Sequence, residues 1–147
     1  MAAIALLRMH GYTNDESYHE KAEDTLEVFA GMAEQFGIFG ATYGAAGVYF
    51  TQPHTQVVVI GEGDEAQRLY VAAVSNFAFN QAAIKLTPNE AVAPNLPPTL
   101  SETIPNLPEI RGKVAIAVVC SGATCQPPVS DPKHLQQQLR ASNSSAA

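Results

Sequence analysis

The chain has 147 residues, of which 46% are hydrophobic and only 15% are charged. This length suits one domain with a sizeable core. The net charge of −6, with 8 Lys and Arg residues and no three of them adjacent, argues against binding to nucleic acid or an anionic membrane, because both need clustered positive charge. So low a charge content also indicates that more than one apolar face is covered, by a partner or by parts of a larger protein.

The cellular location is predicted from the N-terminus and the cysteine content. Residues 1–7 are apolar, but the run is short and no basic segment precedes it, so it does not match a secretory signal. The charge-free stretch 38–51 is shorter than the about 20 apolar residues that a membrane-spanning helix needs. Two cysteines do not make a disulfide scaffold. We therefore expect a cytoplasmic protein.

Helical hairpins are predicted for the first third of the chain. The expected helices lie at 2–10, 15–36 and 38–51. Gly11 is expected to end the first helix, and Thr13 with Glu16 has the spacing of a capping box that begins the second. The first helix is apolar on nearly every side and has no N-cap residue, which is typical of an element packed inside a larger structure.

The third predicted helix contains three glycines in a stretch without charge. No residue between Glu34 and Glu62 is Asp, Glu, Lys or Arg. Each interior glycine costs a helix about 1 kcal/mol relative to Ala, which close packing must offset. Gly40 and Gly44 have the small-xxx-small spacing that lets a second helix approach closely, either within the chain or from another copy. We predict that Gly40, Gly44 and Gly47 form a self-association face and that the protein is a homo-oligomer, with a dimer favoured.

An α/β fold is predicted once the periodicity changes, after Pro53. Strands are expected at 57–61, 82–86 and 114–119, and flanking helices at 64–79 and 131–140. We predict that the three strands form a small parallel sheet of order 2-1-3 behind the N-terminal helices.

One domain, 1–147, is expected to contain all these elements. Its parts are a helical part at 1–53, an α/β part at 54–141 and a frayed tail at 142–147. The proline-rich loop 88–112 within it is expected to lie on a surface, because leucine and isoleucine recur along it.

The segment 61–66 matches the dinucleotide fingerprint G-x-G-x-x-A between a predicted strand and helix. Its acidic residues, Glu62, Asp64 and Glu65, would repel a pyrophosphate, although they suit the N-terminus of a helix. No acidic residue lies about 20 positions further on to hold a ribose. We therefore interpret the segment as a plain turn, predict no cofactor, and assign no catalytic residue.

The only cysteines, Cys120 and Cys125, follow the last predicted strand. They are interpreted in three ways. They pack a loop as structural thiols, or they form a disulfide or redox pair, or they bind a metal with Asp131 and His134. The metal interpretation is the weakest, because a structural zinc site needs four good ligands.

The cysteine segment and the residues after it follow a spacing pattern, Cys120-x4-Cys125-x2-Pro128-x2-Asp131-Pro132-x2-Leu135. This pattern resembles the C-terminal signature of the thioredoxin-domain family that includes spermatogenesis-associated protein 20. Residues 9–26 are similar to the late helix-turn-helix segment of that family, and residues 56–61 resemble the strand after it. The resemblance implies a large protein: a thioredoxin-like domain, a toroid of helical hairpins like that of six-hairpin glycosidases, and then a small α/β tail. This chain resembles only the last hairpins and that tail. The thioredoxin C-x-x-C has no counterpart here, so the resemblance implies no catalytic residue.

Three functions are therefore expected in order of preference. The first is a non-catalytic structural or interaction module that self-associates, with no small-molecule ligand named. The second is a thiol–disulfide redox protein that uses Cys120 and Cys125. The third is a carbohydrate-binding remnant of the toroid, for which Tyr43, Tyr49 and Phe50 would supply aromatic surface.

Overall fold

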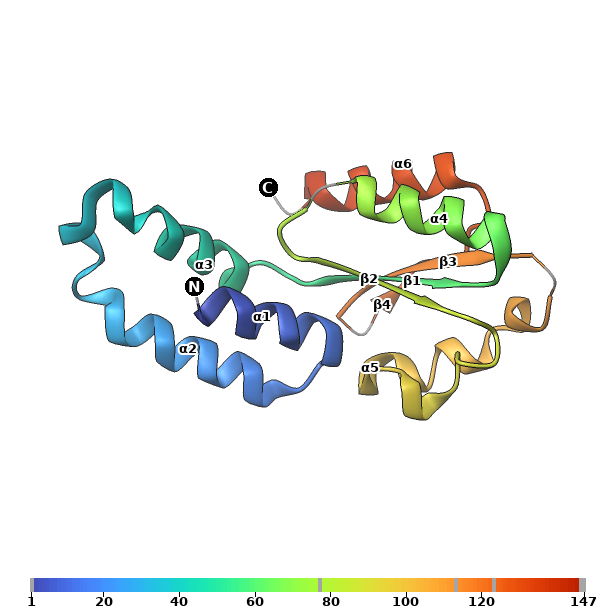
Figure 1. The fold of residues 1–147 in the computed structure, drawn as a ribbon, viewed down its shortest axis with the longest axis horizontal. Coiled ribbons are helices and arrows are strands. Elements are labelled where there is room, and N and C mark those ends of the chain that lie inside the picture. Colours follow the sequence, from blue (N-terminus) through green and yellow to red (C-terminus); the bar gives the residue numbers. More distant parts are fainter. Residues whose placement is uncertain (1, 77, 113, 123, 146–147) are drawn as a thin grey trace. The chain divides into compact units, whose positions relative to one another are not determined.

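The computed structural model describes residues 2–76, 78–112, 114–122 and 124–145 (Figure 1). Contacts divide the chain into two compact units, Met1–Gln52 and Pro53–Ala147, which we call the helical unit and the α/β unit. The boundary between the units follows Gln52, one residue before the predicted boundary between the helical and α/β parts.

The helical unit is built from four elements. They are α1 (Ala2–Thr13), α2 (Glu16–Ala30), the 3₁₀ segment η1 (Ala33–Gly40) and α3 (Ala41–Thr51). The prediction that Gly11 ends the first helix is wrong, because Gly11 is buried inside α1. The predicted helix 15–36 is also too long: α2 ends at Ala30, and Gly37, with a φ of 51°, interrupts the turns that follow.

The start of α2 differs from the predicted capping box. Thr13 is the last residue of α1, and its hydroxyl donates to the Met9 carbonyl oxygen at 2.8 Å. Because α1 runs past Gly11, the turn moves along the chain to Asn14, which has a φ of 53°. Asp15 is the N-cap, and its side chain accepts a hydrogen bond from the Ser17 backbone N–H at 3.0 Å.

The Asp15 cap predicts an acid sensitivity that can be measured. The pKa of Asp15 is lowered mostly by a hydrogen bond from the Ser17 side chain and, to a smaller extent, by one from the Ser17 backbone. A lowered folded-state pKa contributes stability that is present above the unfolded value of about 3.9 and is lost as the pH falls below it. We expect Asp15→Asn, which keeps an acceptor but does not titrate, to lose less stability than the wild type between about pH 5 and pH 3. Urea unfolding at both pH values checks this, and equal losses would contradict it.

The α/β unit contains a mixed sheet of order β2-β1-β3-β4. Its strands are β1 (Thr55–Ile60), β2 (Gln81–Leu86), β3 (Ile116–Ser121) and β4 (Thr124–Cys125). The α/β class and the order 2-1-3 are confirmed, with β4 added at the edge. β1 and β2 are parallel and are joined through α4 (Gly63–Ser75), but β3 runs antiparallel to β1, so the all-parallel prediction is wrong.

The proline-rich segment explains the direction of β3. A parallel strand needs a long crossover, usually a helix. Here the described residues between β2 and β3 form only short helices with proline in their first turn, which cannot make such a crossover. They are η2 (Ala93–Asn95), α5 (Pro98–Ser101), η3 (Ile104–Asn106) and η4 (Pro108–Arg111). The chain therefore enters β3 at the end of the sheet where β2 finished.

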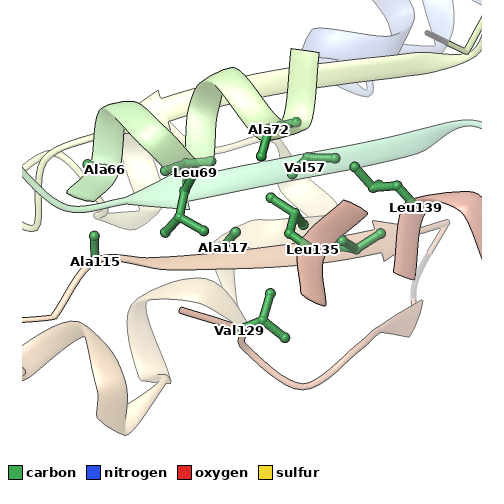
Figure 2. Packing of buried hydrophobic residues seen from close by; sticks show 12 residues of the cluster. Val57, Ala66, Leu69, Ala72, Ala115, Ala117, Val129, Leu135 and Leu139 are labelled. Atoms are coloured by element: carbon green, nitrogen blue, oxygen red, sulfur yellow. The ribbon is translucent and has the colours of Figure 1, made fainter. Parts of the chain in front are cut away.

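Two apolar layers cover the two faces of the sheet (Figure 1). On one face, Val57 and Ala117 meet Leu69 of α4 and Leu135 and Leu139 of α6 (Pro132–Ser145), as Figure 2 shows. On the other face the alternate strand residues are covered by the proline-rich segment. That cluster consists of Val58, Ile60, Ala91, Leu96, Leu100, Ile104, Ile116, Val118 and Cys120. The segment thus packs on a surface as expected, and it forms a core layer.

The last helix continues further than predicted. α6 runs through Ser145, into the segment 142–147 that was expected to be frayed; residues 146 and 147 lie outside the described part. Leu139 is 1% exposed and anchors the last turns in the core. The Ser142 hydroxyl donates to the Gln138 carbonyl oxygen at 3.0 Å.

Candidate functional sites: the disulfide hairpin and the open face of helix α3

The two cysteines lie directly opposite each other at the edge of the sheet. Cys120 of β3 is in register with Cys125 of β4, and their sulfurs form a disulfide of 2.06 Å with the Cα atoms 4.0 Å apart. Gly122, with a φ of 56°, lies in the turn between the strands. Of the three interpretations of the cysteines, the structure contains the disulfide.

The backbone hydrogen bonds next to the disulfide show which type of antiparallel residue pair the two cysteines form. The Gln126 N–H donates to the Val119 carbonyl oxygen at 2.8 Å, so these two residues form a hydrogen-bonded pair. In an antiparallel ladder such pairs alternate with non-hydrogen-bonded pairs, whose side chains lie closer together. Cys120 and Cys125 therefore occupy a non-hydrogen-bonded pair, the position where opposite side chains meet most readily.

The two sulfurs differ in their surroundings. Cys120 is 1% exposed and belongs to the second core layer with Val58 and Val118, whereas Cys125 is only partly buried against that layer. After Gln126, the residues at 127 and 128 are prolines, which lack the N–H needed for pairing. Pairing with β3 resumes at Val129, whose N–H donates to the Ala117 carbonyl oxygen at 2.9 Å. The outer strand of this hairpin is thus attached at both ends and interrupted between them.

Asp131 and Gly61, which belong to the motifs considered for a metal and for a nucleotide, both have structural roles. In the part of the chain that the structure describes, no group of three or more His, Cys, Asp or Glu side chains could hold a metal ion. Asp131 accepts a hydrogen bond from the His134 backbone N–H at 3.1 Å and so begins α6. Gly61 of the fingerprint-like segment has a packing reason to be glycine, because a Cβ there would lie 2.6 Å from Ala115 Cβ.

The structure separates the three glycines that were predicted to form one face. A Cβ on Gly40 would lie 3.2 Å from the Ala33 carbonyl oxygen, so this glycine serves close packing within the helical unit. Gly44 and Gly47 have nothing within 4 Å of such a Cβ. With Val48, which is 42% exposed, they form the outward side of α3, which we call the open face of α3.

A groove on the helical unit was not foreseen from the sequence. It measures about 440 Å³ and is lined mainly by apolar side chains of α1, α2, η1 and α3, among them Leu26, Phe29, Phe36 and Tyr43. Its sequence signal is weak, because these residues follow helical periodicity and read as core. A smaller hollow of about 290 Å³ lies at the carboxyl ends of β1 and β2, beside Glu62 and Asn89.

The aromatic residues considered for a carbohydrate site take part in packing within the helical unit. Tyr43 donates its hydroxyl hydrogen to the Leu26 carbonyl oxygen at 3.3 Å. Phe50 stacks on the His19 ring with centroids 4.6 Å apart. Arg8 donates to the Tyr49 hydroxyl at 3.4 Å, and this hydrogen bond raises the pKa of the guanidinium.

Comparisons with protein-family models, with curated proteins and with solved structures found no match for this chain. The resemblance to the thioredoxin-domain family therefore stays a prediction. No helix among the described residues combines the length and the apolar character needed to cross a membrane.

Proposed function

We propose that this protein is a non-catalytic interaction module whose helical unit associates with a second copy of itself. The observation that carries the proposal is that the helical unit buries few large apolar side chains and exposes many. Among the described residues of the unit, the buried apolar ones are Ala3, Leu7, Ala22 and Ala46, and three of these four are alanines. The larger side chains that pack against them are only partly buried, namely Ile4, Leu6, Leu26, Tyr49 and Phe50. A unit of this size is already near the limit at which a core sustains a fold.

The apolar surface of the helical unit is large by comparison. Ile38 is 85% exposed and Val28 is 72% exposed. Other large apolar side chains of the described part of the unit are also exposed, namely Met9, Tyr12, Phe29, Met32, Phe36 and Val48. Apolar surface of this extent on a small unit is typical of an association site.

The open face of α3 supports a second copy as the partner. Glycines without neighbours let another helix approach closely, and a two-fold axis would bring the same face of each copy together. No charged residue lies between Glu34 and Glu62, so pairing α3 with its symmetry mate buries no charge of that helix. The dimer is thus favoured by apolar burial without a charge desolvation penalty.

The proposal predicts that Gly44→Leu disrupts the dimer. A Cβ at Gly44 would meet nothing within 4 Å in the monomer, and Leu has a higher helix propensity than Gly, so the unit should stay folded. A bulky residue at the contact should weaken association at least about tenfold, which corresponds to about 1.4 kcal/mol. Sedimentation equilibrium over a concentration series measures this.

Gly31→Leu is the matched control, because a Cβ at Gly31 would also meet nothing within 4 Å, while the residue lies outside α3. It should leave the association constant unchanged. A wild-type protein that is monomeric at all concentrations, or an unchanged mass for Gly44→Leu, would refute the proposal.

Two further parts of the proposal rest on the sequence alone. The relation to the C-terminal segment of the thioredoxin-domain family is supported by the Cys120–Leu135 spacing pattern. An antibody against the C-terminal peptide would detect a product several times larger than 15.6 kDa in source cells if the chain is part of such a protein. Cytoplasmic location is proposed from the low cysteine content, since two cysteines do not make a disulfide scaffold, and in that compartment disulfides are usually transient or redox-active.

A further inference from the structure

We infer that the Cys120–Cys125 disulfide is a thiol–disulfide exchange site, which a dithiol reductant opens through Cys125 while the rest of the α/β unit stays folded. This site lies outside the helical unit and is independent of the association proposed above.

The disulfide constrains only a short piece of chain. Its cysteines are 5 residues apart and belong to one hairpin. The stabilisation from a disulfide grows with the length of the loop that it closes, so this one contributes less than a link between distant segments. The unit is held instead by the two core layers and by the pairing of β3 with β1 over six residues.

The strand that the disulfide fastens has few other attachments. β4 has only two residues, and the prolines that follow Gln126 interrupt its ladder. Without the sulfur–sulfur bond, β4 depends on a few backbone hydrogen bonds at the edge of the sheet. Such short edge segments open at low free energy.

The two sulfurs have unequal access, which sets the direction of the reaction. Cys125 is partly exposed and Cys120 is 1% exposed, so an incoming thiolate reaches the Cys125 sulfur. Residues 114–130 carry no charged side chain, so no neighbour in that segment repels an anionic thiolate.

The exchange proceeds in two balanced steps. The thiolate of the dithiol attacks Cys125 Sγ, the disulfide breaks, and its electron pair passes to Cys120 Sγ, which takes a proton. The second thiol of the reductant then attacks the reductant sulfur that is bonded to Cys125. This releases the Cys125 thiolate, which takes a proton. The cystine gains two electrons and two protons, and the dithiol becomes a cyclic disulfide. The Cys120 thiol stays in the core as a small apolar group.

The test uses the full chain under native conditions with dithiothreitol, followed by iodoacetamide and hydrogen exchange. We expect Cys125 to be alkylated under native conditions, while Cys120, which is 1% exposed, is alkylated only after unfolding. The Gln126 amide should exchange at least about tenfold faster while the β1 amides keep their protection. With glutathione, peptide mapping should locate the mixed disulfide on Cys125. The variant Cys120→Ser/Cys125→Ser is the control, and its exchange pattern should match that of the reduced protein.

Two results would overturn the inference. One is alkylation of Cys125 only at denaturant concentrations that also unfold β1, which would make the disulfide a purely structural link. The other is a mixed disulfide on Cys120, which would reverse the assigned direction of attack.

Discussion

Gly61→Ala is expected to destabilise the α/β unit by about 4 kcal/mol, from backbone strain and overpacking together. Gly61 has a φ of 148°, a conformation that residues with a side chain rarely adopt. The added Cβ would lie 2.6 Å from Ala115 Cβ and 2.9 Å from Ala115 Cα. Because Ala115 is 3% exposed and one of the two atoms belongs to the backbone, the contact cannot be relieved by a rotamer change.

Gly63→Ala separates the two causes. Gly63 also has a positive φ, 68°, but nothing lies within 4 Å of the position that its Cβ would take. It should lose only the strain contribution, about 1–2 kcal/mol. Urea unfolding followed by circular dichroism gives both values. Equal losses at the two positions would show that close packing against Ala115 is not what requires glycine.

The strands could be predicted because their burial follows directly from residue type. β1 is buried over five consecutive positions, and four of them, residues 57–60, are the β-branched residues typical of a strand covered on both faces. The direction of β3 could not be predicted in the same way. It depends on the end of the sheet at which the proline-rich segment brings the chain into β3. That position is set by the packing of residues such as Leu100 and Ile104 of this segment on the sheet.

The disulfide hairpin was identifiable only in part. β4 is too short to show a periodicity, so its two residues were missed. The spacing of the cysteines was an available signal: residues five apart, with a turn at Gly122, fall opposite each other when the hairpin turn has two residues. The groove of the helical unit had no comparable signal, because α2 ends at Ala30 whereas the helical periodicity of the sequence continues to Phe36, within η1.

Leu100→Ala is expected to cost about 3–4 kcal/mol, because it removes a large apolar side chain from a core that cannot collapse around the cavity. Leu100 is 0% exposed and packs on the face of the sheet that carries Val58 and Val118. Only a segment that is a fixed layer of the fold would transmit such a loss to the whole unit. A proline-rich loop resting loosely on the sheet would move and fill the space.

Val92→Ala in the same segment is the control, since Val92 is 42% exposed and its truncation should change the free energy of unfolding by less than about 0.5 kcal/mol. Thermal and urea unfolding of both variants measure the difference. A cost below about 1 kcal/mol for Leu100→Ala would mean that the segment is dispensable for the fold. A cost of about 3–4 kcal/mol would instead mean that the segment is a core layer on which the stability of the α/β unit depends.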